Sequence, residues 1–391
     1  MALIPLSPID HIFTGSGSYP IEFVFAYDGT VDADRLASSL EEALEHFAPV
    51  ASKLVRLAED AYGLEPSDDG LHFEVASSTL TFSEAGARYG FLNPVHSVQG
   101  EPLTRIKLSQ TPQGSVVGVS MSHAVADGFS YFHFLSSWAR LFHGLPIHPP
   151  SHQRELLIPA STEPAKRLTS EDVLAECGVH WGERRSAIAR ERLRWHRYQF
   201  SREEMNEILS QAQRDCDVRL SHNDAITAWL WKRYVPAWSA GTTDSTARAS
   251  CPVDFRRLLD GFPPTYFGCA VSLAIVSVDR EYLSNAPLGV LAQKIRSTVA
   301  QVDADYVRKS LSVVERLRRQ EGLSVLEHCH VIHPHSGILV TNLSRLPVHE
   351  LEFDAGPPVA FDILTPAERG AVILPAADGA DIRVCLPQET S

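Results

Sequence analysis

The sequence predicts an α/β or α+β fold with two domains of similar size. Strand-like and helix-like segments alternate in both halves of the 391-residue chain, which is long enough for each half to bury its own core. An irregular, proline-rich passage that begins at Pro146 separates the halves. We therefore expect a first domain over 1–145, a crossover linker over 146–194 and a second domain over 195–391.

The composition is that of an ordinary soluble protein, with 44% hydrophobic and 21% charged residues. The net charge of −13 argues against nucleic acid or an anionic membrane as a partner, because both attract basic faces. No segment has the apolar length that crosses a bilayer, and the opening MALIPLSPIDHIF lacks a signal-peptide pattern. The six cysteines are scattered without a C-x-x-C pair, as is typical of free thiols. We expect a cytoplasmic protein without membrane or nucleic-acid partners.

The first half contains one clear helix and several strands. Leu6–Asp10, with its serine, proline and aspartate, is predicted to be a turn-rich lead-in. A helix is predicted over Val31–Phe47, because Asp32 can cap it, apolar residues recur on one face and Pro49 ends it. Strands are predicted at Ile21–Tyr27, Phe73–Leu80 and Leu103–Leu108.

The linker and the second half show a basic run and two capping patterns. A helix is expected near Ser170–Glu176. Six arginines between Arg184 and Arg197 could meet a ligand phosphate, but a solvated helix face explains them better. Helix starts are predicted where Ser201 precedes Glu204 and where Ser221 precedes Asp224. The remaining predicted elements are a helix over Asn223–Tyr234, a charged helix over Arg308–Arg319, and strands at Val271–Val276, Gly337–Val340 and Asp381–Leu386.

The segment Val116–Phe142 carries the most suggestive chemistry. An apolar strand leads into Ser-His-Ala-Val-Ala-Asp-Gly, and a helix with a regular apolar face follows. His123 therefore lies at the end of a buried strand, where a neutral imidazole can act as a general base near pH 7. Asp127 lies just before the helix, next to Gly128, which can permit a sharp turn. The alternative interpretation is that His123 is an ordinary loop histidine and Asp127 a helix cap.

Other familiar sites fit poorly. Gly128-Phe129-Ser130 lacks the final glycine of a serine-hydrolase elbow, and no P-loop is present. Gly15-Ser16-Gly17 is followed by Tyr-Pro, which spoils a dinucleotide-binding loop. The histidine cluster His328–His335 alternates as metal ligands on a strand can, but a proline interrupts it and no second cysteine lies near, so no metal site is expected.

Two further segments look like strand ends that run into polar loops. The first contains DFRR at Asp254–Arg257 and PPTYFGC at Pro263–Cys269, and the second contains TNLSRLP at Thr341–Pro347 and EFDAG at Glu352–Gly356. Together with LSPID near the start and SHAVADGFS, these segments occur in the order found in the BAHD family. The chain thus resembles the BAHD acyl-CoA-dependent acyltransferases, nearest to their hydroxycinnamoyl-CoA:shikimate hydroxycinnamoyltransferase-like members, over nearly its whole length.

The resemblance has departures. Leu343 stands where the family usually has tryptophan, and Cys269 replaces the asparagine of Y-F-G-N. The segment Glu352–Gly356 replaces D-F-G-W-G, a segment regarded as structural in the family. Ser122 rather than a second histidine precedes His123, which differs from the condensation domains of peptide synthetases.

The resemblance implies two chloramphenicol-acetyltransferase-like domains with a solvent channel between them. It implies direct acyl transfer from acyl-CoA, as co-substrate without a further cofactor, to a hydroxyl or amine of a small-molecule acceptor. His123 would be the general base and Thr341 the oxyanion donor, with Asp127 turned away and paired with Arg256. Gly128 would permit the turn, and Tyr266 and Gly268 would shape the wall of the site. A monomer is expected.

Three points remain open at this level. The product can be an ester or an amide, and the donor can be CoA or a carrier protein. The alternative function is a weakly active or inactive relative that binds a thioester or an acyl-carrier-protein partner, suggested by Leu343 and Ala355 in place of aromatic residues.

Overall fold

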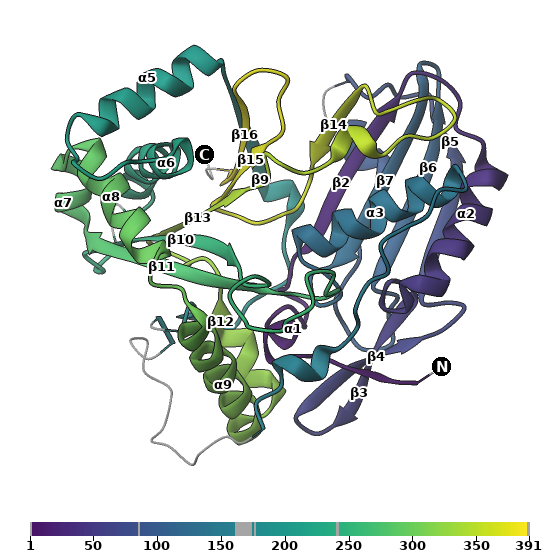
Figure 1. The fold of residues 1–391 in the computed structure, drawn as a ribbon, viewed down its shortest axis with the longest axis horizontal. Helices are drawn as coiled ribbons and strands as arrows, with labels where there is room; N and C mark the ends of the chain where they lie inside the picture. Colours follow the sequence, from purple (N-terminus) through teal and green to yellow (C-terminus); the bar gives the residue numbers. More distant parts are fainter. Residues whose placement is uncertain (1, 85–86, 161–173, 176, 240–241, 389–391) are drawn as a thin grey trace.

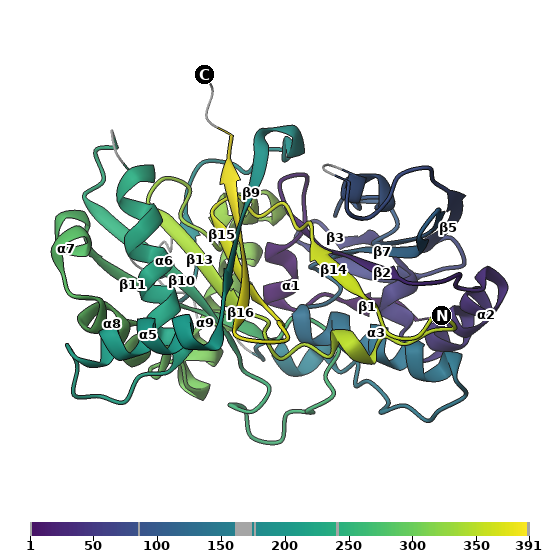
Figure 2. The ribbon, with the colours of Figure 1, turned by 90° about the horizontal axis from the view of Figure 1, so that it is seen from above.

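The computed structural model describes residues 2–84, 87–160, 174–175, 177–239 and 242–388 (Figure 1). Two large sheets, one from each half of the chain, stand next to each other, and helices pack on both (Figures 1 and 2). Each half has its own large cluster of buried apolar side chains. No helix within these ranges is long and apolar enough to cross a membrane.

The first sheet has five strands in the order β14-β2-β7-β6-β5. Helices α2 and α3 pack against each other over this sheet (Figure 1). The predicted cap of α2 is confirmed, because the Asp32 carboxylate accepts from the backbone N–H groups of Asp34 and Arg35. The elements are β2 (Pro20–Tyr27), α2 (Ala33–His46), β5 (Leu71–Ser77), β6 (Thr104–Thr111), β7 (Gly114–Ser122), α3 (Gly128–Phe142) and β14 (Ala360–Ile363).

The second sheet has six strands in the order β11-β10-β13-β15-β16-β9. Both predicted capping boxes are present, at Ser201 and at Ser221. The elements are β9 (Leu193–Phe200), α5 (Arg202–Gln213), α6 (His222–Trp238), β10 (Thr246–Asp254), β11 (Val271–Asp279), α7 (Arg280–Asn285), α8 (Leu288–Val299), β13 (Gly337–Asn342), β15 (Gly370–Leu374) and β16 (Ala380–Pro387). The predicted strands and helices of both halves are thus confirmed, with ends shifted by a few residues.

Strand β14 departs from the predicted division at residue 195. It comes late in the chain but pairs antiparallel with β2 of the first sheet, from Ala360 opposite Ala26 to Ile363 opposite Phe23. Figures 1 and 2 both show it lying beside β2. The two halves are therefore joined by an exchanged strand as well as by the crossover.

A third group of elements lies between and below the large sheets. Leu6–Asp10 was predicted to be a turn-rich lead-in, and the structure instead begins helix α1 (Pro8–Ile12) there, with a capping box between Ser7 and Asp10. The charged helix is confirmed as α9 (Ala304–Glu321). Two small sheets contain β1 (Ile4–Pro5), β4 (Ala61–Pro66) and β3 (Ser52–Ala58), and β12 (Cys329–His330) and β8 (His180–Trp181). The helix expected near Ser170–Glu176 lies almost entirely outside the described residues.

The basic run is not the face of a helix that was predicted, although Arg192, Arg194 and Arg197 are exposed to solvent. Its last arginines lie on strand β9 and a short 3-10 turn precedes them. Arg190 forms a two-pronged ion pair with Glu22, at 2.5 and 2.8 Å, and Ser120 donates a third hydrogen bond to the same carboxylate. Glu22 is completely buried on β2, so its charge needs this cation. Arg190 therefore binds the crossover to the first sheet.

We expect Arg190→Met to lower the free energy of unfolding by about 1–3 kcal/mol near pH 7, because the buried Glu22 carboxylate loses its partner. Burial already raises the pKa of Glu22 and Arg190 opposes that shift, so in the variant the pKa rises further. Protonation then relieves the buried charge, and the difference from wild type should shrink as the pH falls to about 5. Denaturant unfolding at both pH values measures this.

The matched control is Arg192→Met, since Arg192 is exposed on the same segment and should be neutral. Equal stability of the two variants at both pH values would contradict the role given to Arg190.

Candidate active site

A cavity of about 490 Å³ lies between the two halves of the molecule. Strand β2 and the loop after β7 contribute to one wall, and strands β11, β13 and β15 and helix α9 contribute to the other. Most of the lining side chains are apolar, whereas His123, Thr341 and Arg345 are among the polar ones. The site is therefore assembled from residues more than 200 positions apart in the chain.

His123 is the first residue after β7, and it is held by aromatic contacts. Its ring stacks on Phe13 with centroids 4.0 Å apart and meets the edge of Tyr19 at 6.2 Å. Nδ1 is sealed from solvent and makes no hydrogen bond to another described residue. The Nε2 atom is thus the nitrogen left for a molecule in the cavity.

The environment of His123 keeps its imidazole neutral. Burial lowers the pKa of His123 below its usual 6.5, and the nearby Asp127 carboxylate opposes this only in part. A neutral imidazole on a rigid strand end has the protonation state that a general base needs near pH 7.

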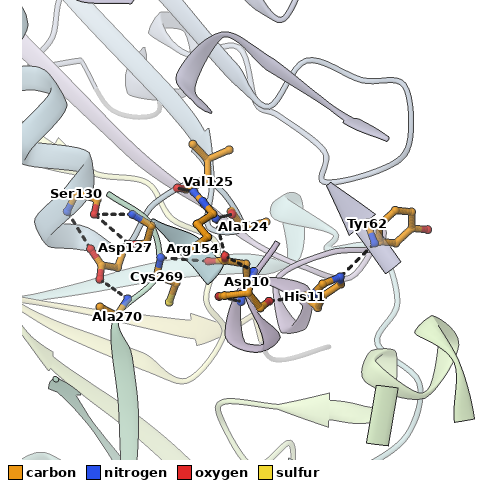
Figure 3. Close-up of polar contacts among 12 residues, drawn as sticks. Asp10, His11, Tyr62, Ala124, Val125, Asp127, Ser130, Arg154, Cys269 and Ala270 are labelled. Atoms are coloured by element: carbon orange, nitrogen blue, oxygen red, sulfur yellow. Dashed lines mark hydrogen bonds and ion pairs between the residues drawn. The ribbon is translucent and has the colours of Figure 1, made fainter. Parts of the chain in front are cut away.

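Asp127 is buried, and donors occupy both of its carboxylate oxygens. Oδ1 accepts from the backbone N–H of Ser130 at 2.9 Å and Oδ2 from that of Ala270 at 2.9 Å (Figure 3). Arg256 adds contacts to both oxygens, at 3.0 and 2.9 Å. Burial alone would raise the pKa of Asp127, but the charge and hydrogen bonds of Arg256 lower it below its usual value. The expected Asp127–Arg256 pair is confirmed, and Asp127 also caps helix α3.

Tyr266 and Gly268 are in a layer behind the cavity. Neither belongs to its described lining. Their backbone carbonyls accept from Arg256 at 3.2 and 3.3 Å, and the hydroxyl of Ser130 joins the same group. A Cβ on Gly268 would meet the Tyr266 ring within 2.9 Å, so a side chain at that position would displace the ring. Tyr266 and Gly268 thus hold Arg256 in place. They were predicted to shape the wall of the site, but neither residue is among those that line the cavity.

Gly128 lines the cavity, but its backbone does not show the glycine-dependent turn that was predicted for it. It is the first residue of α3 and is absent from the residues with positive φ, so no left-handed turn requires a glycine here. A Cβ at this position would lie 3.4 Å from Leu343, which is an ordinary contact. Leu343 itself lines the cavity next to this point.

Thr341 lies near the end of strand β13, where it pairs with Val372 and lines the cavity. Its hydroxyl makes no hydrogen bond within the described part of the chain, so the hydroxyl can serve a ligand. The segment Glu352–Gly356 lies elsewhere: Phe353 packs on Trp138 and Phe142 in the first core, with ring centroids 5.4 and 5.2 Å apart. That position agrees with a structural role.

Several residues of the site were missed by sequence reasoning. Phe13 and Tyr19 flank His123, and Arg345 lines the cavity while exposed to solvent. The buried pair of Asp10 and Arg154 lies behind the His123 loop. The Ser-x-x-Asp capping pattern at Ser7–Asp10 was the one available signal, since it indicates a helix start that places Phe13.

The histidine cluster makes structural hydrogen bonds. Nδ1 of His328 donates to the carbonyl of Gly182 at 2.9 Å, and Nε2 of His330 donates to that of Glu183 at 2.7 Å. His333 bonds through Nδ1 to the hydroxyl of Ser336 at 2.9 Å. Across the described ranges, no group of three potential metal ligands comes together.

Comparison with solved structures shows the same fold over almost the whole chain. The crystal structure of F. graminearum TRI101 complexed with coenzyme A and deoxynivalenol superposes with a TM-score of 0.76 at 16% identity, and covers 99% of this chain and 95% of that one. Vinorine synthase gives a TM-score of 0.71 at 18% identity, with 99% and 91% covered. The two halves are thus the chloramphenicol-acetyltransferase-like units expected from the sequence.

Sequence comparison places the chain in a family. Hydroxycinnamoyltransferase 2 of Oryza sativa subsp. japonica is 26% identical over 389 residues, which are 89% of this chain and 82% of that protein. Anthranilate N-benzoyltransferase protein 1 of Dianthus caryophyllus is also 26% identical, with 89% and 80% covered. Shikimate O-hydroxycinnamoyltransferase of Nicotiana tabacum is 24% identical, with 85% and 78% covered. The Transferase family model matches residues 3–390. The chain therefore belongs to the Transferase family, the BAHD acyl-CoA-dependent acyltransferases.

Proposed function

We propose that this enzyme transfers an acyl group directly from acyl-CoA to a hydroxyl or amine of a small acceptor, with His123 as general base. The observation that carries the proposal is the position of His123, whose Nε2 is left to the cavity while Nδ1 is sealed. Nε2 would take the proton from the acceptor as its oxygen or nitrogen attacks the thioester carbonyl. The tetrahedral intermediate would then collapse with loss of the CoA thiolate, which takes up the proton.

Two other features support direct transfer. Thr341 lines the same cavity with an uncommitted hydroxyl, so it can donate to the oxyanion of the tetrahedral intermediate. The largely apolar cavity can hold the acyl group and the acceptor together, which supplies an orientation effect. Asp127 is a poor candidate for the base, because both of its carboxylate oxygens already accept hydrogen bonds from Ser130, Ala270 and Arg256.

Arg345 supports a narrower statement about the acceptor. It lines the cavity, and no ion pair or hydrogen bond is recorded for its guanidinium within the described residues. Shikimate and anthranilate, which appear in the names of relatives, are carboxylates. We propose that the acceptor carries a carboxylate that pairs with Arg345.

The first prediction concerns His123. Release of free thiol from hydroxycinnamoyl-, benzoyl- and acetyl-CoA is measured with pooled alcohols, phenols and amines. We expect acceptor-dependent release by the wild type and a loss of about 10²–10⁴-fold in His123→Ala. His143→Ala is the control, because His143 is exposed near the end of α3 and should leave the rate unchanged.

Equal release by wild type and His123→Ala would remove His123 as the base. Absence of release from both proteins, with CoA still raising the melting temperature, would favour the thioester-binding or carrier-protein-binding alternative.

The second prediction concerns pH. The base must be neutral, and burial holds the pKa of His123 below its usual value. The value of kcat/KM should therefore be level around pH 7 and should fall only as the pH drops through a midpoint below about 6.5. A pH–rate profile from about pH 5 to about pH 8 measures this, and a midpoint at or above pH 7 would contradict the environment described for His123.

The third prediction concerns Arg345. Arg345→Gln should raise KM for a carboxylate acceptor by about 10–100-fold, because one charge-assisted hydrogen bond is lost. Its KM for the uncharged alcohol analogue of that acceptor should not change. Arg257→Gln, an exposed neighbour of Arg256 outside the described lining, serves as the control. An equal change in KM for both acceptors would reject the carboxylate contact.

A further inference from the structure

A completely buried ion pair lies directly behind the loop that carries His123. Nη1 of Arg154 is 2.5 Å from Oδ2 of Asp10, and both side chains have no exposed surface (Figure 3). Removing two charges from water is costly, so such a pair is not by itself a gain in stability over apolar residues. The pair also makes hydrogen bonds to the surrounding backbone, and these indicate what it does.

Arg154 binds the backbone between His123 and Asp127. Nη1 donates to the carbonyl of Ala124 at 3.2 Å and Nη2 to that of Val125 at 2.6 Å. These are the two residues that follow His123, so their carbonyls fix the direction in which the chain leaves the base. Figure 3 shows the guanidinium between these carbonyls and Asp10. A planar guanidinium can hold three oxygens in a fixed arrangement, which a lysine ammonium cannot do in the same way.

Asp10 connects the same point to two other parts of the molecule. Oδ2 accepts from the backbone N–H of Ser7, which closes the capping box of α1. Oδ1 accepts from the backbone N–H of Cys269 at 3.1 Å, next to Gly268, whose carbonyl accepts from the backbone N–H of Asp127 at 3.3 Å. The carboxylate thus ties α1 to the loop that supports Arg256.

The position of α1 matters because Phe13 follows it directly. Phe13 is the residue that ends α1, and its ring forms the flat wall on which the His123 imidazole stacks. Arg154 thus holds the backbone after His123, and Asp10 holds the helix that carries the wall beside its ring.

We propose that Arg154 and Asp10 are positioning residues that fix the backbone and ring orientation of His123 for proton transfer. The inference rests on the proposed role of His123 as the base. Neither residue belongs to the described lining of the cavity, so neither would touch substrate. Loss of the Arg154–Asp10 pair should therefore lower the rate of the catalytic step more than the affinity for substrates.

The test uses Arg154→Lys, which keeps the positive charge and removes the planar fork. We expect kcat to fall by about 10–100-fold, since displacement of a catalytic group by about 1 Å has effects of this size. The dissociation constant for CoA, measured by calorimetry, should stay within about twofold of wild type. Asp10→Asn, which keeps the shape of the side chain, should also lower kcat without changing the dissociation constant for CoA. This variant replaces Arg154→Lys in the test if Arg154→Lys does not fold.

The matched control is Arg383→Lys. Arg383 and Asp362 form another buried pair, 5% and 7% exposed with Nε and Oδ1 2.9 Å apart, and neither lines the described cavity. This variant should lose a similar amount of thermal stability but keep kcat. If Arg154→Lys also keeps kcat, or if kcat and CoA affinity fall together, the pair is only structural and the proposal is overturned.

A double-mutant cycle separates this proposal from the function on which it rests. Arg154→Lys is measured in the wild-type and His123→Ala backgrounds. If Arg154 acts through His123, it should have little further effect once the imidazole is gone. If the effects of the two substitutions on kcat are fully additive, the positioning role of Arg154 and Asp10 is rejected, while His123 can still be the base. If His123→Ala alone keeps wild-type activity, the proposed role of His123 as base is rejected, and the positioning role of Arg154 and Asp10 is rejected with it.

Discussion

The ion pair of Asp127 and Arg256 is the interaction on which the arrangement of the site depends. Asp127 lies between β7 and α3 of the first half, and Arg256 follows β10 of the second half. Their contacts at 3.0 and 2.9 Å, together with the backbone N–H of Ala270, join the halves at one buried point. Loss of either partner would leave a buried charge alone, which typically costs about 3–5 kcal/mol. The pair therefore holds together the two walls of the cavity.

The two halves are further prevented from separating by elements that cross between them. Strand β14 returns from the second half to pair with β2, and Arg190 of the crossover binds Glu22 on that same strand. The crossover also supplies Arg154, which binds the loop after His123. A cavity between two sheets is stable only if its walls are fixed from outside, because its own apolar lining gains less from packing than a filled core does. These contacts supply that fixing.

Local pattern predicted a large part of the fold. The capping residues Ser201 and Ser221 located two helices, and the strand-loop-helix pattern around His123 located the candidate base. The patterns failed where a partner distant in the chain decides the outcome. The basic run was predicted to be a solvated helix because no residue near it in the sequence indicates that Arg190 pairs with Glu22, which lies 168 positions away. In the same way, no local signal connects Arg154 with Asp10, 144 positions earlier, and a glycine at 128 suggested a turn that the helix does not need.

The chemistry of the site depends on the different surroundings of two ionisable groups in one short loop. His123 and Asp127 are four residues apart, Asp127 is buried and His123 is half-buried, and burial disfavours the charged form of each. Asp127 overcomes this with a cation and two backbone donors and stays ionised, whereas His123 has aromatic neighbours and stays neutral. The carboxylates of Asp127 and Asp10 raise the pKa of His123, but burial is the larger effect and keeps it below its usual value. A protonated imidazole cannot take a proton from another molecule, so the neutral form is the one that a general base needs. Burial thus acts in the same direction on both groups, and only the group that has a cation and backbone donors stays charged.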